Sequence, residues 1–260
     1  MTQDYKKNDT TIIQSVDKAL DILSCFSISE PEFGVTQLAT RLGMYKSSVF
    51  RTLKTLEQRG FVVQDANTQK YRLGFKLFDL GTAVISGLEV RTVALPLMQG
   101  LCSRTKETVT LDIADNDERV CIEKVEGTES VRAFVQIGLR HPLYIAASGK
   151  LLLAYMPQED IERILSKKTF HATATGRVVD PLLLRTELAE IACRGYSFSN
   201  GERSMGTSAY AAPIRNHEGK VIASLSISGP ESRFTDERKE MLLSEILRTV
   251  KDISAHLGWR

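Results

Sequence analysis

The chain has 260 residues, of which 42% are hydrophobic and 25% charged, and its formal net charge is +2. These values are typical of a soluble globular protein, and the length allows one large or two modest domains. The longest apolar run, residues 151–156, is far shorter than the ~20 residues that cross a bilayer, and no signal peptide is apparent. We therefore expect a cytoplasmic protein without a membrane segment.

The basic residues gather near the N-terminus. Residues 1–80 contain 11 Lys and Arg against 9 Asp and Glu, whereas the two classes are balanced in the rest of the chain. Within residues 41–60, five basic residues accompany a single acid, Glu57. This local excess indicates a surface for an acidic partner.

The first elements are helices. After a polar tail over residues 1–14, helical spacing predicts a helix from Ser15, its expected N-cap, to Phe26. A shorter helix follows over residues 35–42 and ends at Gly43. The apolar face of the first helix is expected to consist of Val16, Ala19, Leu20, Leu23 and Phe26.

A third helix is predicted within residues 46–62, with Val49, Leu53 and Leu56 on its core side. Ala39, Gly43 and Val49 have the spacing of a helix-turn-helix: a small residue at the crossing, a turn glycine and a core aliphatic. Two extended runs, residues 61–64 and 70–73, then predict a hairpin. This order is that of a winged helix-turn-helix domain, which we assign to residues 15–74.

The polar face of the third helix is expected to enter a DNA major groove, with the hairpin tip touching the backbone or minor groove. The expected DNA-binding residues are Tyr45, Lys46, Ser47, Ser48, Arg51, Lys54, Gln58, Asn67, Gln69 and Lys70.

A linker helix is predicted over residues 75–90. Its apolar stripe, which would pack on its own domain or on another subunit, consists of Leu77, Leu80, Val84 and Leu88. Beyond it, residues 91–260 mix helices and strands, so this second region is α+β. The expected helices are 92–106, with Pro96 in its first turns, 148–156, 158–167, 180–195 and 235–256, and the expected strands are 108–115, 119–127, 131–138, 195–200, 206–216 and 220–230.

The catalytic motifs that this sequence partly matches are incomplete. Residues 144–151 lack the first glycine and the Ser or Thr of a phosphate-binding loop, and residues 206–210 lack the closing glycine of a nucleophile elbow. The four histidines and four cysteines have no metal-ligand spacing. We expect no catalytic residue, metal or cofactor. The alternatives are an enzyme with a basic DNA-binding appendage and a ligand-independent architectural DNA-binding protein.

Several segments in order, among them "SVDKALDILSCF", "QLATRLGMYKSSVFRTLKTLEQRGFV", "GLRHPLYIAASGKLLLAYMP" and "GTSAYAAPIRNHEGKVIASLSISGP", resemble the IclR-type bacterial transcription regulators. The resemblance covers nearly the whole chain. It implies a winged helix-turn-helix, a linker helix and a C-terminal effector-binding domain of GAF-like α+β fold. It also implies a homodimer or dimer of dimers that binds double-stranded operator DNA and responds to a small, often anionic metabolite.

The last predicted strand has Ser224, Ser226 and Ser228 on one face. By itself this pattern is typical of a solvated sheet surface. The resemblance instead places Ser226 and Ser228 in a pocket floor, where their hydroxyls bind a carboxylate. It places Ser148 and Gly149 at the pocket wall, where a helix N-terminus offers free N–H groups to an anion.

The chain departs from the family's usual residues around this pocket. Ser199 stands at the start of a stretch that is often acidic, Ala209 replaces a common cysteine, and Tyr144 replaces a frequent histidine. An organic or sugar acid is expected, and an aromatic acid stacked near Tyr144 or Met205 stays open. The expected effector-binding residues are Tyr144, Ser148, Gly149, Ser199, Met205, Ala209, Ser226 and Ser228.

Overall fold

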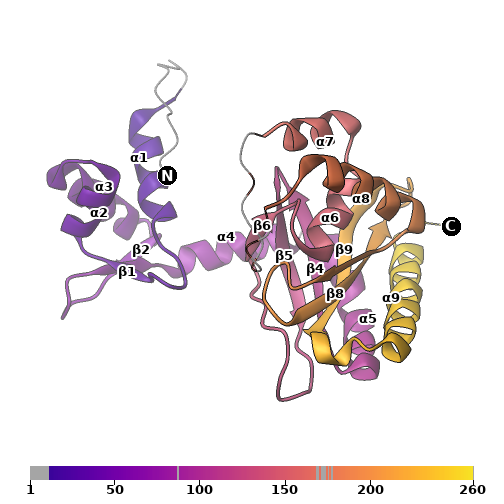
Figure 1. The fold of residues 1–260 in the computed structure, drawn as a ribbon. Helices are drawn as coiled ribbons and strands as arrows, with labels where there is room; N and C mark the ends of the chain where they lie inside the picture. Colours follow the sequence, from indigo (N-terminus) through magenta and orange to yellow (C-terminus); the bar gives the residue numbers. More distant parts are fainter. Residues whose placement is uncertain are drawn as a thin grey trace. The chain divides into compact units, whose positions relative to one another are not determined.

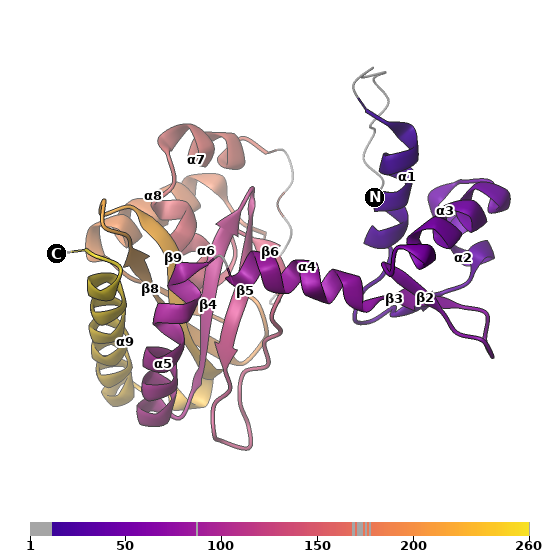
Figure 2. The same cartoon turned by 180° about the vertical axis from the view of Figure 1, so that it is seen from behind.

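The computed structural model describes residues 12–86, 88–167, 170, 174, 176 and 178–259. The chain divides into two compact units, residues 1–87 and 88–260, and each has its own hydrophobic core (Figures 1 and 2). The first unit contains a helix-turn-helix, and the second is a sheet with helices on both faces. The expected α+β fold is thus confirmed.

The first unit is a winged helix-turn-helix. Its helices are α1 (Gln14–Ser24), α2 (Val35–Leu42) and α3 (Lys46–Gln58), and a small antiparallel sheet joins β1 (Glu32–Phe33), β3 (Tyr71–Leu73) and β2 (Val62–Gln64) in that order.

The predicted helix-turn-helix spacing is confirmed. Gly43 ends α2 in the left-handed conformation, with a φ of 64°, and Ala39 and Val49 are buried on either side of the turn. Leu53 and Leu56 of α3 are buried as well, so the core side of this helix is the predicted one. The opposite face of α3 is left for solvent or a partner.

The start of the unit differs from the prediction. Ile13 occupies the N-cap position of α1, so Ser15 lies inside the helix and does not cap it. Val16 and Leu20 are exposed, whereas Ile22 is fully buried. The reason is that α1 packs on the core only through its C-terminal half. The strand β1 was not predicted, because two residues carry no periodic pattern.

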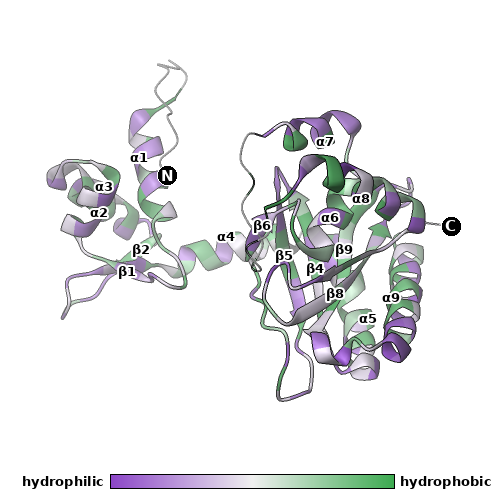
Figure 3. Ribbon diagram, in the orientation of Figure 1, coloured by the Kyte–Doolittle hydropathy of each residue, from purple (hydrophilic) through white to green (hydrophobic). Residues whose placement is uncertain are grey.

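The linker helix α4 (Phe75–Ser86) is shorter than expected. Leu88 is not part of it: this residue takes the N-cap position of α5 and packs against the core of the second unit. The predicted stripe therefore loses one member. Leu80 and Val84 are exposed on α4, along which Figure 3 shows other apolar residues.

The second unit is built on a six-stranded antiparallel sheet in the order β6-β5-β4-β9-β8-β7. Helices α5 and α9 cover one face and α6 and α8 cover the other, with α7 beside them (Figure 1). The strands are β4 (Thr108–Asp115), β5 (Glu118–Val125), β6 (Arg140–Pro142), β7 (Ser197–Asn200), β8 (Thr207–Arg215) and β9 (Val221–Pro230). The helices are α5 (Glu89–Thr105), α6 (Ala146–Ala154), α7 (Gln158–Leu165), α8 (Pro181–Arg194), the short 3-10 helix η1 (Glu231–Arg233) and α9 (Asp236–His256).

The two faces of β9 have different environments. Leu225 and Ile227 belong to the main core beneath α5 and α9. Ser224, Ser226 and Ser228 point to the other face and are also buried, with exposed fractions of 0%, 4% and 5%. A solvated serine face is therefore excluded.

Residues 131–138 do not form the predicted strand. The carbonyl groups of Val131, Ala133 and Phe134 accept hydrogen bonds from the side chains of Arg233, Thr108 and Arg203. Side-chain donors thus take the place of a neighbouring strand.

The helix α5 also differs from its prediction. It begins three residues before the expected position, so Pro96 lies in its middle. No single helix among the described residues is long and apolar enough to cross a membrane. The helices α4 and α5 reach that length and composition only together, and Ala94, Met98 and Leu101 of α5 are buried in the core.

Candidate functional site

The exposed face of α3 presents polar and basic side chains. Tyr45 is 86% exposed at the N-cap position, and Lys46, Ser47 and Gln58 are exposed along the helix. Arg51 is also exposed, and within the described part of the chain its side chain has no hydrogen bond or ion pair. Its guanidinium group is therefore available to a partner.

Two other basic residues of this surface are engaged within the first unit. Lys54 donates to Glu57 at 2.8 Å and to Gln64 of β2 at 3.2 Å, which ties α3 to the hairpin. Lys70 forms an ion pair with Glu32 at 2.6 Å. These lysines have a structural role beside any contact with DNA.

The tip of the hairpin is held by Asp65. Its carboxylate accepts the backbone N–H groups of Thr68 and Asn67, and these bonds, with the Thr68 hydroxyl, lower the pKa of Asp65. Gln69 has a positive φ of 58° and donates to the Ala66 carbonyl. The turn thus leaves the side chain of Asn67 exposed at the tip.

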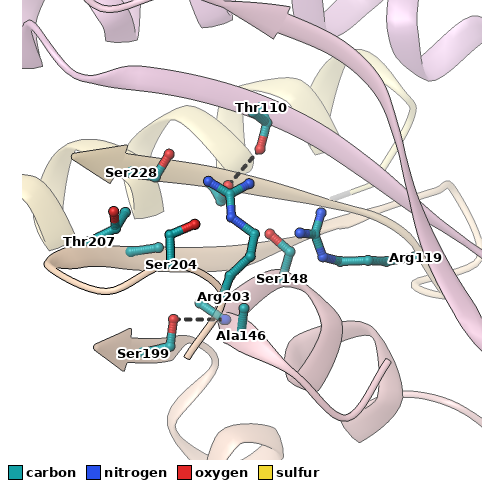
Figure 4. Close-up of a pocket in the computed structure, with 12 residues that line it drawn as sticks. Thr110, Arg119, Ala146, Ser148, Ser199, Arg203, Ser204, Thr207 and Ser228 are labelled. Carbon is teal, nitrogen blue, oxygen red and sulfur yellow. Dashed lines mark hydrogen bonds between the residues drawn. The ribbon is translucent and has the colours of Figure 1, made fainter. Parts of the chain in front are cut away.

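In the second unit, a pocket lies between the serine face of the sheet, the start of α6 and the loop that precedes β8 (Figure 4). We call it the serine pocket. Its lining residues are Thr110, Arg119, Ala146, Ala147, Ser148, Ser199, Arg203, Ser204, Thr207, Ala209, Ser226 and Ser228.

The serine pocket contains a buried ion pair. The Arg119 guanidinium donates to Asp112 at 2.5 Å, and both side chains are almost fully buried. The Thr110 hydroxyl lies 3.0 Å from the other oxygen of Asp112 and 2.7 Å from the Ser226 hydroxyl. A continuous chain of polar groups therefore joins β5, β4 and β9.

A second guanidinium group reaches the same pocket. Arg203 extends from the loop before β8 toward Thr110 and Arg119 (Figure 4). Its only hydrogen bond within the described residues is a long one, 3.4 Å, to the Phe134 carbonyl. Of the two guanidinium groups, that of Arg119 is thus paired with Asp112, and that of Arg203 is bonded to no carboxylate of the described residues.

Neighbouring titratable groups do not compensate this positive charge. Burial, followed by the charges of Arg119 and Arg203, lowers the pKa of His141 to about 4, so its ring is neutral at neutral pH. Burial raises the pKa of Cys121 to about 12, so its thiol is neutral too. Burial and the nearby Arg119 lower the pKa of Arg203, yet a guanidinium stays protonated in proteins. The pocket therefore favours an anion.

Two buried polar atoms of the pocket have no partner among the described residues: the Ser228 hydroxyl and Nε of Arg119. A buried polar group without a hydrogen bond costs about 1–3 kcal/mol. A polar ligand that bonds to these atoms recovers this energy.

The N-terminus of α6 is already occupied by side chains of the same unit. The Ala146 N–H donates to Glu202 at 2.9 Å, and the Ala147 N–H donates to the Ser199 hydroxyl at 3.0 Å. These two N–H groups are therefore not free for a ligand. The two guanidinium groups supply positive charge to the same pocket.

The pocket brings together Ser148, Ser199, Ala209, Ser226 and Ser228 of the eight predicted effector residues. The other three lie elsewhere.

Met205 is 75% exposed and does not line the serine pocket. Gly149 is packed against the backbone, since a Cβ atom there would lie 2.7 Å from the Leu143 carbonyl oxygen. Tyr144 is buried, and its ring packs edge-on against Phe170 with 4.8 Å between the ring centroids. Their positions indicate packing or surface roles.

Tyr144 lines a second cavity, of about 150 Å³, that we call the Lys150 cavity. The buried Lys150 ammonium donates to Glu187 at 2.5 Å and to Glu202 at 2.6 Å. Asp180 lines this cavity too, so carboxylates outnumber cations among its described lining residues.

Sequence reasoning missed Thr110, Arg119 and Arg203. Arg119 alternates along β5 with Val120 and Ile122, which face the main core, a signal that Arg119 faces away from that core. Arg203 lies in an irregular loop without periodicity. Among the described residues, no group of His, Cys, Asp and Glu side chains could hold a metal ion.

Comparisons with known proteins agree with these two units. Residues 15–66 match the IclR helix-turn-helix domain and residues 82–255 match the bacterial transcriptional regulator IclR C-terminal domain. The chain is 35% identical to the HTH-type transcriptional regulator KipR of Bacillus subtilis, over 95% of this chain and 98% of KipR. It is 34% identical to the HTH-type transcriptional regulator KdgR of Escherichia coli, over 95% of this chain and 94% of KdgR.

The fold is also similar to that of a solved structure. An IclR homologue from Microbacterium hydrocarbonoxydans, crystallised with 4-hydroxybenzoate, superposes with a TM-score of 0.80 at 26% identity. The match covers 93% of this chain and 99% of the homologue.

Proposed function

Because the chain belongs to the IclR family of DNA-binding transcription regulators, we propose that a small anionic metabolite in the serine pocket changes its affinity for operator DNA. Its relatives are named as transcriptional regulators or repressors, so it is not an enzyme. It acts in the cytoplasm, where operator DNA lies. The observation that carries the proposal is a pocket lined with hydroxyl groups and two guanidinium groups, of which only that of Arg119 is bonded to a carboxylate of the described residues.

Binding to DNA is assigned to α3 and the hairpin. The exposed side chains of Lys46, Ser47, Arg51 and Gln58 enter the major groove, with Tyr45 and Ser48 at the start of the helix. Asn67, Gln69 and Lys70 contact the backbone or minor groove, and Lys54 supports α3 from the hairpin. Phosphate contacts set the position of the domain, whereas contacts to base edges give specificity.

Replacing Arg51 with Ala should weaken specific operator binding by ~1–3 kcal/mol and relax the preference for one base pair. The reason is that an unpaired arginine in the groove can donate two bonds to a guanine. Fluorescence anisotropy with a set of operators, each changed at one base pair, measures both effects. Arg59→Ala, at the C-terminal end of the same helix, is the matched control. Unchanged affinity and selectivity in Arg51→Ala would show that this face does not read DNA.

A homodimer is the functional unit in this proposal, since a dimer reads two half-sites of a palindromic operator. The exposed apolar residues Leu80 and Val84 of α4 are the part of the predicted stripe that is available to a partner copy. A dimer of dimers is consistent with the same surface.

Replacing Leu80 and Val84 together with Glu should dissociate the dimer, because charged groups would be buried in an apolar contact. Light scattering at micromolar concentration measures the mass of wild type and variant. Lys76→Glu and Asp79→Lys, on exposed positions of the same helix, keep its net charge and serve as the control. A monomeric wild type, or a variant that stays dimeric, would refute this role of α4.

A ligand-independent DNA-binding protein is the competing proposal. Such a protein does not require a buried pocket whose polar atoms lack hydrogen-bond partners. Binding of a small acid to the second unit, accompanied by a change in operator affinity, separates the two proposals.

A further inference from the structure

Glu202, the residue before Arg203, holds the loop that carries Arg203 in place. Glu202 accepts the Ala146 N–H at 2.9 Å and pairs with Lys150 at 2.6 Å on the far side of α6. Gly201 and Gly206 flank this segment with positive φ values of 69° and 70°, which permits the tight path of the loop. The side chain of Arg203 is thereby directed into the serine pocket (Figure 4).

Charge complementarity in the pocket is incomplete. Asp112 neutralises Arg119 through a direct bond, but no carboxylate of the described residues bonds to Arg203. A planar guanidinium with free N–H groups matches the two oxygens of a carboxylate. One carboxylate on Arg203 would balance the charge of the pocket.

The remaining lining is made of hydroxyl groups and small side chains. Thr110, Ser226 and Ser228 form one row along the sheet, and the hydroxyl of Ser228 has no partner in the described part of the chain. Among the described lining residues, the apolar ones are alanines and none is aromatic. Hydroxyl groups of a ligand would find both donors and acceptors in this row.

The Lys150 cavity suits an acid less well than the serine pocket does. Its volume is about 150 Å³, but its described lining residues include three carboxylates, of Asp180, Glu187 and Glu202, and one cation, Lys150. The serine pocket is therefore the better candidate for an acid.

From these observations we infer that the ligand of the serine pocket is a small aliphatic acid that carries hydroxyl groups. Its carboxylate binds Arg203, and its hydroxyl groups bind Thr110, Ser226 and Ser228. Arg203 is thus the residue that selects an acid over its neutral analogue. The inference rests on the proposed function for the identity of the pocket as the effector site.

Isothermal titration calorimetry of the full chain, without DNA, tests this ligand class. The probes are glycolate, lactate and glycerate, with glyceramide as the neutral analogue of glycerate and benzoate as an aromatic acid. Glycerate should bind at least roughly tenfold more tightly than glyceramide and benzoate, since a charge-assisted hydrogen bond contributes this much or more. Tighter binding of benzoate than of every hydroxy acid, or no binding of any hydroxy acid at millimolar concentration, would overturn the inference.

Variants test the role of Arg203. Arg203→Gln should lose glycerate affinity by roughly tenfold or more and no longer distinguish glycerate from glyceramide. Arg203→Lys keeps the charge without the planar pair of donors, so it should bind glycerate with intermediate affinity, and it replaces the Gln variant if that one does not fold. Arg248→Gln, an exposed position of α9, is the matched control.

Wild-type affinity for glycerate in both Arg203 variants would overturn the assignment. Because calorimetry does not involve DNA, failure here is distinguishable from failure of the proposed function, which operator titration tests separately.

Discussion

Replacing Glu107 with Ala should destabilise the second unit by about 3 kcal/mol. The Glu107 carboxylate is fully buried, accepts hydrogen bonds from Arg233 at 2.6 and 2.5 Å and forms an ion pair with Arg238 at 3.1 Å. Without it, two guanidinium groups stay partly buried and lose the carboxylate that pairs with both of them. The expected loss lies at the low end for a buried ion pair, because each arginine keeps about a quarter of its side chain in water.

Urea unfolding, followed by the fluorescence of the single tryptophan, Trp259, measures this loss of stability. Trp259 lies in the second unit, so its fluorescence during urea unfolding follows that unit and not the first. Glu190→Ala on the exposed side of α8 is the control and should change stability by less than about 0.5 kcal/mol. If the Glu107 and Glu190 variants unfold alike, the buried ion cluster does not support the sheet that carries the serine pocket.

The second large effect is expected for Ser226→Ala and Ser228→Ala combined. This variant should bind operator DNA as the wild type does but lose the response to the effector, a typical coupling of ~1–3 kcal/mol or roughly 5- to 150-fold. Alanine keeps the apolar face of β9, where Leu225 and Ile227 pack in the core, and removes only hydroxyl groups from the pocket.

Ser224→Ala is the matched control for this variant. Ser224 lies on the same strand and face and is fully buried, and its hydroxyl has no partner among the described residues, but it does not line the serine pocket. Operator titrations with and without the effector should therefore show a normal response in the control. An equal response in the double variant would place the effector elsewhere in the second unit.

The helix-turn-helix was predictable from the sequence because local constraints determine it. Gly43 must take a positive φ, Ala39 must be small, and Val49 must face the core, all within eleven consecutive residues. The two faces of β9 were equally predictable, since Leu225 and Ile227 alternate with Ser226 and Ser228. The sequence did not predict which face lines a pocket, because this depends on how α6 packs over the strand.

The charged part of the serine pocket depends on contacts between distant segments. Asp112 and Arg119 meet across the β4–β5 pair, whose register shifts at a bulge between Leu111 and Asp112. Arg203 arrives from a loop that Glu202 attaches to α6. Neither a bulge nor a loop anchored by one side chain produces a periodic pattern, so the composition of the pocket required the structure.

The N-terminus of α6 was predicted to attract an anion, but the sequence did not show which anion binds there. A helix N-terminus attracts anions, and this one does hold a carboxylate, but the carboxylate belongs to Glu202 of the same chain. The sequence predicts the attraction of the helix end and does not reveal which group satisfies it. The Ala146 and Ala147 N–H groups are thus taken, whereas Arg203 has no bonded carboxylate among the described residues.

Coupling between the pocket and DNA requires that the effector bind more tightly to one of two conformations that differ in operator affinity. The linker helix α4, between the hairpin and the second unit, is the segment through which such a difference would pass. The most direct test is titration of operator DNA with the wild-type chain, with and without a saturating amount of the acid that calorimetry ranks first. We predict a shift of roughly 5- to 150-fold in operator affinity. Superimposable titration curves, with the acid bound to the protein, would contradict an effector-controlled regulator.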